Sequence, residues 1–183
     1  MSASEILRKD HEEILKLEKV ISTCYQCLYD GHHIPLSDIE KITFLISEFL
    51  DSIHFTREEG SYFPCVASYD MLRKEISALL IEHEFSRNIA KKLSEYLARW
   101  KNGEDMREPV ARYLRTYSIF LIDHMSKEED FFEKAENMVL SKEEEREMYE
   151  QFTSVSAIST RLTELLDEIK LLQEKAWFTS STQ

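Results

Sequence analysis

Histidine and glutamate occur in two copies of one short pattern, His-x3-Glu, about seventy positions apart. His54 is followed by Glu58, and His124 is followed by Glu128. Residues four apart share one face of a helix, so each pair can present a nitrogen and an oxygen donor to one point. Alone, such a pair is more often an ordinary surface contact. Two copies in one chain favour metal coordination.

Two further histidines repeat at a similar interval. Asp10-His11-Glu12 recurs as Glu82-His83-Glu84. Apolar residues at helical spacing flank all four histidines, which predicts that their side chains point into the interior of a helical bundle. Two buried carboxylates would be very costly there without cations, unless protonation relieved the cost. We therefore expect a dinuclear metal site formed by six residues: His11, His54, Glu58, His83, His124 and Glu128.

The donor types narrow the choice of metal. Six mixed nitrogen and oxygen donors suit iron or manganese, whereas zinc usually takes fewer ligands, often including sulfur. Two iron ions are the predicted cofactor, with manganese and zinc less favoured. The competing interpretation is a structural bundle whose histidines and glutamates bind no metal.

Long helices must position these residues, because Gly and Pro occur only three times each in 183 residues. Capping boxes begin at Ser2, Ser37 and Ser141, and predict three helix starts. The expected helices cover residues 2–29, 37–60, 70–101, 109–135 and 141–176. The sequence thus predicts an all-α fold in which the first four form an up-down-up-down bundle over residues 1–140. An irregular stretch is expected after Pro64.

The fifth predicted helix defines a C-terminal segment over residues 141–177, with a frayed tail over 178–183. Its apolar residues recur at roughly heptad spacing. It could pack along the bundle or form a dimer seam, and packing within the chain is favoured. The chain is therefore expected to be a monomer or a homodimer.

Composition excludes some functions. The net charge of −12 argues against nucleic acid as a partner, since phosphate binding requires clustered Lys and Arg. No apolar run approaches the length of a membrane span, and the N-terminus lacks the features of a signal peptide. We expect a soluble, cytoplasmic protein that does not bind membranes.

The six residues, in the order His, His-x3-Glu, His, His-x3-Glu, resemble the hemerythrin-like, or His-His-Glu cation-binding, family over roughly residues 6–135. The resemblance implies a four-helix di-iron bundle in which the four histidines are terminal ligands. It also implies that Glu58 and Glu128 bridge the two irons together with an oxo or hydroxo group.

One departure from the family pattern bears on function. Oxygen-carrying hemerythrins have a further histidine one turn after the third-helix histidine, and here that position is Arg87. The duplication then implies His11 and His54 at one iron, and His83 and His124 at the other, with an open position at each. This favours a reactive centre for oxygen, peroxide or nitric oxide in stress response or iron-centre repair, served by a redox donor protein. A reversible oxygen store or sensor is the alternative.

Several neighbouring residues could support such a site. Arg87 could reach a bridging glutamate or gate an open position. Tyr117 and Phe120, with four other aromatic residues, could wall a pocket for a diatomic or peroxide ligand, although core packing explains most of them equally well. These four are Phe55, Phe63, Phe85 and Phe132.

The acids beside the histidines and glutamates are predicted to be solvated or paired surface groups, because an adjacent position lies about 100° around a helix. They are Asp10, Glu59, Glu82, Asp123 and Glu129. Cys24 and Cys27 form a C-x2-C pair, and Cys65 follows the second helix. Buried thiols are favoured over a redox or metal-binding role for the three cysteines.

Overall fold

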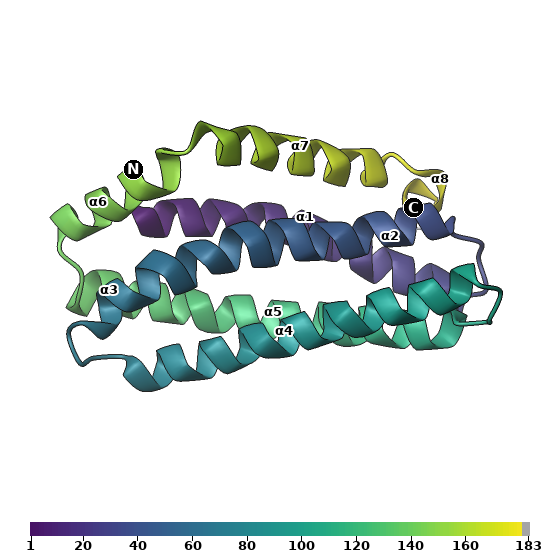
Figure 1. Ribbon diagram of the computed structural model, residues 1–183, viewed down its shortest axis with the longest axis horizontal. Helices are drawn as coiled ribbons and strands as arrows, with labels where there is room; N and C mark the ends of the chain where they lie inside the picture. Colours follow the sequence, from purple (N-terminus) through teal and green to yellow (C-terminus); the bar gives the residue numbers. More distant parts are fainter. Residues whose placement is uncertain (181–183) are drawn as a thin grey trace.

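Four antiparallel helical rods form the body of the protein in the computed structural model, which describes residues 1–180 (Figure 1). The first is α1 (Ala3–Tyr29), the third is α4 (Arg73–Lys101) and the fourth is α5 (Arg107–Met138). The second rod joins four segments: α2 (Leu36–Leu45), η1 (Ile46–Phe55), η2 (Glu58–Tyr62) and α3 (Phe63–Ala67). Residues 1–180 contain no strand. The predicted all-α, up-down-up-down bundle is confirmed.

Local sequence signals explain several of the helix ends. Ser2 caps α1 through the predicted capping box with Glu5, and Gly31 follows the helix with a φ of 79°. The box predicted at Ser37 does not form. Pro35 occupies the cap position instead, and its fixed φ suits a helix start. α2 therefore begins at Leu36, one residue before the predicted start at residue 37.

The second rod differs from its prediction in two ways. η1 and η2 are π-helical, with the wider turn that the i→i+5 hydrogen bond produces. The helical path also continues through Pro64 to Ala67, so the irregular stretch expected after Pro64 begins later and covers residues 68–72, where Asp70 and Leu72 have positive φ angles. Pro64 lies in the first turn of α3, where its missing N–H leaves little backbone bonding to lose.

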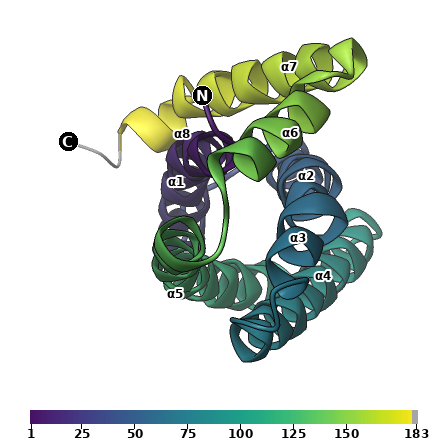
Figure 2. The same cartoon turned by 90° about the vertical axis from the view of Figure 1, so that its left-hand side faces the viewer.

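The segment predicted as one fifth helix is three helices: α6 (Lys142–Thr153), α7 (Ser156–Gln173) and α8 (Ala176–Thr179). The extended backbone of Val155 separates α6 from α7, because an extended residue cannot continue a helix. α7 lies along α1 and the second rod (Figure 2). Phe178, predicted to belong to a frayed tail, lies in α8, and residues 181–183 of that tail are outside the described residues.

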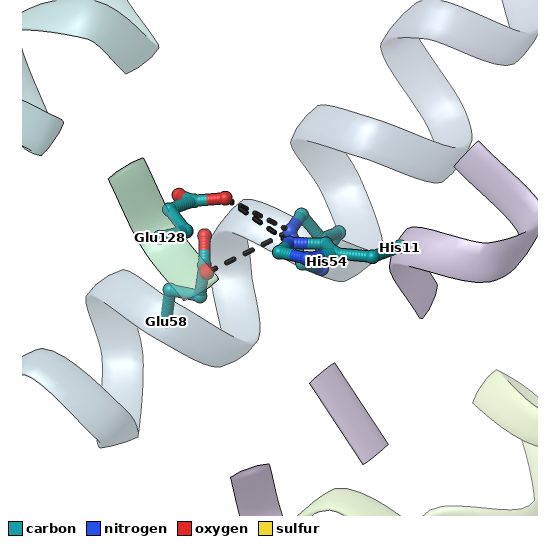
Figure 3. Close-up of side chains that lie close together, drawn as sticks. All are labelled: His11, His54, Glu58 and Glu128. Carbon is teal, nitrogen blue, oxygen red and sulfur yellow. Dashed lines mark hydrogen bonds and ion pairs between the residues drawn. The ribbon is translucent and has the colours of Figure 1, made fainter. Parts of the chain in front are cut away.

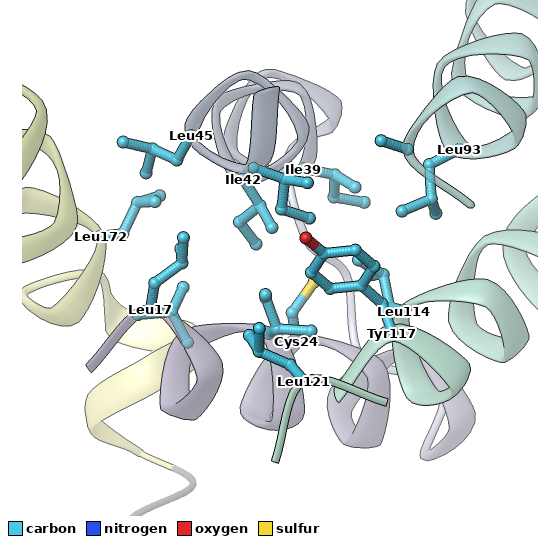
Figure 4. Close-up of a cluster of buried hydrophobic side chains, with 14 of the residues drawn as sticks. Leu17, Cys24, Ile39, Ile42, Leu45, Leu93, Leu114, Tyr117, Leu121 and Leu172 are labelled. Carbon is cyan, nitrogen blue, oxygen red and sulfur yellow. The ribbon is translucent and has the colours of Figure 1, made fainter. Parts of the chain in front are cut away.

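Two apolar clusters fill the bundle. The larger contains aliphatic side chains from α1, α2, α4, α5 and α7, together with Cys24 and Tyr117 (Figure 4). The smaller, at the other end, contains Leu7, Tyr62 and Phe132. The six polar residues of the predicted metal site lie along the helices between these clusters. Within residues 1–180, no helix has both the length and the apolar character needed to cross a membrane.

Candidate metal centre

All six predicted residues converge at the centre of the bundle. His11 comes from α1, His54 and Glu58 from the π-helical part of the second rod, His83 from α4, and His124 and Glu128 from α5. Each side chain is buried; His11, the most accessible residue of the six, is 4 % exposed. Figure 3 shows four of them directed toward one another.

Glu128 directs one carboxylate oxygen toward each pair of histidines. Its Oε2 lies 3.1 Å from His11 Nε2 and 3.8 Å from His54 Nε2. Its Oε1 lies 3.3 Å from His83 Nε2 and 2.8 Å from His124 Nε2. The carboxylate therefore spans two clusters of imidazole nitrogens.

Glu58 is placed in the same way. Its Oε1 lies 3.6 Å from His54 Nε2, and its Oε2 lies 3.4 Å from His83 Nε2. Atoms of His11, His54, Glu58 and Glu128 all lie within 4.8 Å of one another, as do atoms of the second set: His83, His124 and Glu128. The histidines thus form two pairs, His11 with His54 and His83 with His124. These are the pairs expected from the sequence duplication.

The donor set fits a pair of cations. Both oxygens of Glu58 and the Nε2 atoms of His54 and His124 are buried without a hydrogen-bond partner. Buried polar atoms of this kind are costly unless something coordinates them. Metal ions between the two glutamates would provide the missing partners, and mixed imidazole and carboxylate donors are suited to iron.

The two glutamates differ in protonation when no metal is bound. Burial and the charge of Glu128 raise the pKa of Glu58 well above its usual range. Burial also acts to raise the pKa of Glu128, but the charge of His124 and the hydrogen bond from His11 outweigh it and lower that pKa well below its usual range. One proton on Glu58 thus relieves the repulsion between the two carboxylates.

Two histidines gain basicity from the same contacts. Burial lowers the pKa of His11, but its hydrogen bonds with Glu128 and Glu129 outweigh burial and raise the pKa to about 9. Burial is likewise outweighed at His124, where Glu128 and Glu82 raise the pKa to about 9. Protons and metal ions therefore compete for these two imidazoles.

A carboxylate lies against the outer ring nitrogen, Nδ1, of every central histidine. The pairs are His11 with Glu129 (2.8 Å), His54 with Asp10 (3.4 Å), His83 with Glu59 (2.7 Å) and His124 with Glu82 (2.7 Å). Each acid comes from the neighbouring rod, so the contacts run once around the bundle. An acceptor at Nδ1 keeps the proton there and leaves Nε2 free to face the centre.

These contacts correct the prediction that the adjacent acids are surface groups. It is wrong for four of the five, because a rotation of about 100° brings each carboxylate against a histidine of the next helix. Asp10 is buried there, and the other three acids are partly exposed. Asp123 alone is exposed, and it pairs with Lys127. The sequence feature that could have identified these four acids is their position directly beside a predicted ligand. They are Asp10, Glu59, Glu82 and Glu129.

A cation contacts each of the four acids in turn. The pairs are Arg57 with Asp10 (2.5 Å), Arg8 with Glu129 (3.0 Å), Arg87 with Glu59 (2.8 Å) and Lys127 with Glu82 (2.5 Å). Arg87 also contacts Asp51 and Glu84. Within residues 1–180, Arg87 forms no hydrogen bond or ion pair with Glu58 or Glu128, so it does not reach a bridging glutamate, which was one of its two suggested roles.

Aromatic rings cover the histidines. Phe55 stacks on His83 with 3.7 Å between centroids, and Phe120 stacks on His124 at 5.2 Å. Phe63 and Phe132 stack on His83 and His11, respectively. Tyr117 instead packs against Phe120, and Phe85 is 47 % exposed. Four of the six aromatic residues thus contact a central imidazole, and Tyr117 and Phe85 do not.

The cysteines lie away from this centre. Cys24 and Cys27 are buried in the larger apolar cluster, and Cys65 is partly exposed. Within residues 1–180, no disulfide joins any of the three. Burial raises the pKa of Cys24, which keeps its thiol protonated and unreactive. For Cys24 and Cys27, this environment agrees with the preferred prediction of buried thiols, whereas Cys65 is partly exposed.

Comparison with protein families gives one clear result. The model of the hemerythrin HHE cation-binding domain matches residues 2–135, which include all six central residues. No curated protein and no solved structure has significant similarity to the chain. The match covers most of the sequence and agrees with the buried cluster of histidine and glutamate side chains. The chain belongs to the hemerythrin HHE cation-binding domain family.

Proposed function

We propose that this protein binds two iron ions and reacts with oxygen, peroxide or nitric oxide, in oxidative or nitrosative stress response or in iron-centre repair. The observation that carries the proposal is the placement of Glu58 and Glu128, each with one oxygen toward each pair of histidines. Bound iron would supply redox chemistry toward these small molecules.

The protein's own groups would have distinct tasks. The four Nε2 atoms and two carboxylates would hold the ions, and the carboxylates at Nδ1 would fix the orientation of the imidazoles and increase their basicity. The stacked aromatic rings exclude water and lower the local dielectric. These features favour a small uncharged molecule as the species that reaches the centre.

The residue at position 87 favours reaction over storage. Each half offers two imidazoles and one oxygen from each glutamate, and Arg87 adds no third imidazole because its guanidinium is held by Asp51, Glu59 and Glu84. Ions that prefer six donors would keep positions for exogenous ligands in both halves. Repeated turnover would also require an external electron donor.

Metal reconstitution and rapid mixing test the proposal. We expect anaerobically reconstituted protein to hold two irons per chain, and its ferrous form to be oxidised by oxygen or peroxide or to bind nitric oxide. His54→Ala should lose iron, whereas His33→Ala, a change at an exposed histidine, should retain it. Absence of iron would refute the proposal. Reversible oxygen binding without oxidation would favour an oxygen store or sensor.

A further inference from the structure

A row of aromatic rings leads from a central histidine to Tyr62. Phe132 stacks on His11 with 5.5 Å between centroids, and Tyr62 lies 5.3 Å from Phe132. All three rings are buried, and Tyr62 is 0 % exposed. Phenol is the most readily oxidised group in this row. The short separations place it within reach of electron tunnelling to the centre.

The hydroxyl of Tyr62 begins a hydrogen-bond chain that ends on a carboxylate. Its oxygen lies 2.6 Å from Ser4 Oγ, and Ser4 Oγ donates to Glu145 Oε1 at 2.5 Å. Ser4 has one hydroxyl proton, and that proton faces Glu145. Tyr62 must therefore donate to Ser4, which gives its proton a direct route toward Glu145.

Glu145 connects this chain to the surface. It belongs to α6, where its other oxygen accepts from Ser4 N at 3.0 Å. It also lines an open pocket with Ser2, Lys142 and Arg146. A proton that reaches Glu145 can exchange with solvent there, while the phenol itself stays dry.

Oxidation of a phenol requires such an acceptor. Burial raises the pKa of Tyr62, so the resting side chain is neutral. Loss of an electron makes a phenol strongly acidic, and the proton must leave at the same time if no charge is to remain in the apolar cluster. Ser4 and Glu145 supply this path.

Tyr117 provides a built-in comparison. It lies 5.9 Å from Phe120, which stacks on His124, so it is also one ring away from a central histidine. Its hydroxyl pairs with Ser86 at 2.9 Å. Within residues 1–180, no carboxylate is hydrogen-bonded to Ser86. Tyr117 thus has a similar aromatic row but lacks the acceptor for its proton.

We infer that Tyr62 is a redox-active tyrosine that gives one electron to the metal pair through Phe132 and His11, and its proton to Glu145 through Ser4. The inference rests on the proposed function and identifies peroxide as the oxidant class. Reduction of hydrogen peroxide to two waters takes up two electrons and two solvent protons. With iron bound in the ferrous–ferric state, the metal would supply one of these electrons. Tyr62 would supply the other, pass its proton to Glu145 through Ser4, and become a neutral radical.

The test uses the full chain, reconstituted with iron and brought to the ferrous–ferric state. One equivalent of hydrogen peroxide is added, and samples frozen at intervals are examined by electron paramagnetic resonance. We expect a tyrosyl radical in the wild type, with hyperfine structure that changes when the protein carries ring-deuterated tyrosine. Tyr62→Phe should abolish this radical, and Tyr117→Phe should retain it.

Variants of the proton path give a second measurement. Glu145→Gln keeps the shape of the side chain but removes the base, so the radical should form more slowly and in lower yield. Iron content and thermal unfolding of each variant establish that the fold and the metal pair are intact.

The outcomes separate the inference from the proposed function. If peroxide oxidises the iron but no tyrosyl radical forms, or if the radical is lost only in Tyr117→Phe, Tyr62 is a packing residue and the inference fails alone. If Glu145→Gln leaves the rate and yield unchanged, the assigned proton path is wrong. If the chain binds no iron, the inference and the proposed function fail together.

Discussion

The carboxylates behind the central histidines are the residues that most change the interpretation of this sequence. Asp10, Glu59, Glu82 and Glu129 each contact the Nδ1 atom of a histidine on the neighbouring rod. Each acid in turn contacts a cation that lies about one turn from that histidine along the same rod. These contacts fix the imidazole rings before any metal arrives, because each ring is held from its outer side.

Removal of one such acid should weaken metal binding without removing a ligand. Glu82→Ala is expected to lower metal affinity by about 10–100-fold, since His124 loses the acceptor at its Nδ1. Asp123→Ala is the matched control. Asp123 also contacts Lys127, but its exposed carboxylate makes no contact with a histidine. Calorimetric titration with Mn²⁺ would measure both, and equal losses in the two variants would contradict the assigned role.

Metal affinity should also depend on pH through His11 and His124. Their pKa values of about 9 in the metal-free fold exceed the ordinary 6.5, so their protonation stabilises that fold fully below pH 6.5. This stabilisation is lost as the pH rises through about 9. Metal requires the neutral imidazole, so affinity should increase between these pH values and binding should release protons. Calorimetric titration with metal in buffers of different ionisation enthalpy would count the released protons. A metal affinity that does not change with pH would refute this expectation.

At the scale of the elements, sequence patterns predict what depends on local chemistry. Apolar periodicity and capping residues place the four rods. The two His-x3-Glu pairs, together with His11 and His83, identify the six residues that meet at one point. The π-helical turns of η1 and η2 have no such local signal, because the i→i+5 register depends on packing against neighbouring rods. The break between α6 and α7 at Val155 likewise has no local sequence signal, and the apolar pattern predicted one continuous helix there. The contacts of the adjacent acids depend on which rods are neighbours, which the linear pattern does not specify.

The packing of α7 on the bundle gives a prediction about this element. Leu165 is buried between α7 and the bundle, whereas Leu171 is 52 % exposed on the same helix. Leu165→Ala should reduce the free energy of unfolding by about 2–5 kcal/mol, because it leaves a cavity in the core. Leu171→Ala should change it by less than about 0.5 kcal/mol. Chemical denaturation would measure both. A small effect of Leu165→Ala would indicate that α7 does not pack in this way.

For the whole molecule, the centre joins four rods that otherwise pack through apolar side chains. The candidate ligands come from every rod, so ions bound between them would link the folding of distant parts of the chain. A metal that binds only the folded protein raises its stability by mass action. Without metal, the ionised forms of the two buried glutamates have opposite effects on the stability of the fold. Glu58 is held protonated, while Glu128 is ionised among histidines.

Matched substitutions of the two glutamates should therefore have opposite effects on the metal-free protein. Glu58 has a raised pKa, so wild-type stability falls as the pH rises above its ordinary value of 4.5, and Glu58→Gln should relieve this loss. Glu128 has a lowered pKa and stabilises the fold above pH 4.5, so Glu128→Gln should reduce stability there. Urea denaturation at pH 8 with a chelator would compare them. When metal is added, both variants should gain less stability than the wild type, since Gln has one oxygen where the carboxylate offers one to each half. A loss of metal-free stability in Glu58→Gln as large as that in Glu128→Gln would show that the two carboxylates share the charge equally, and would contradict the protonation assigned to them.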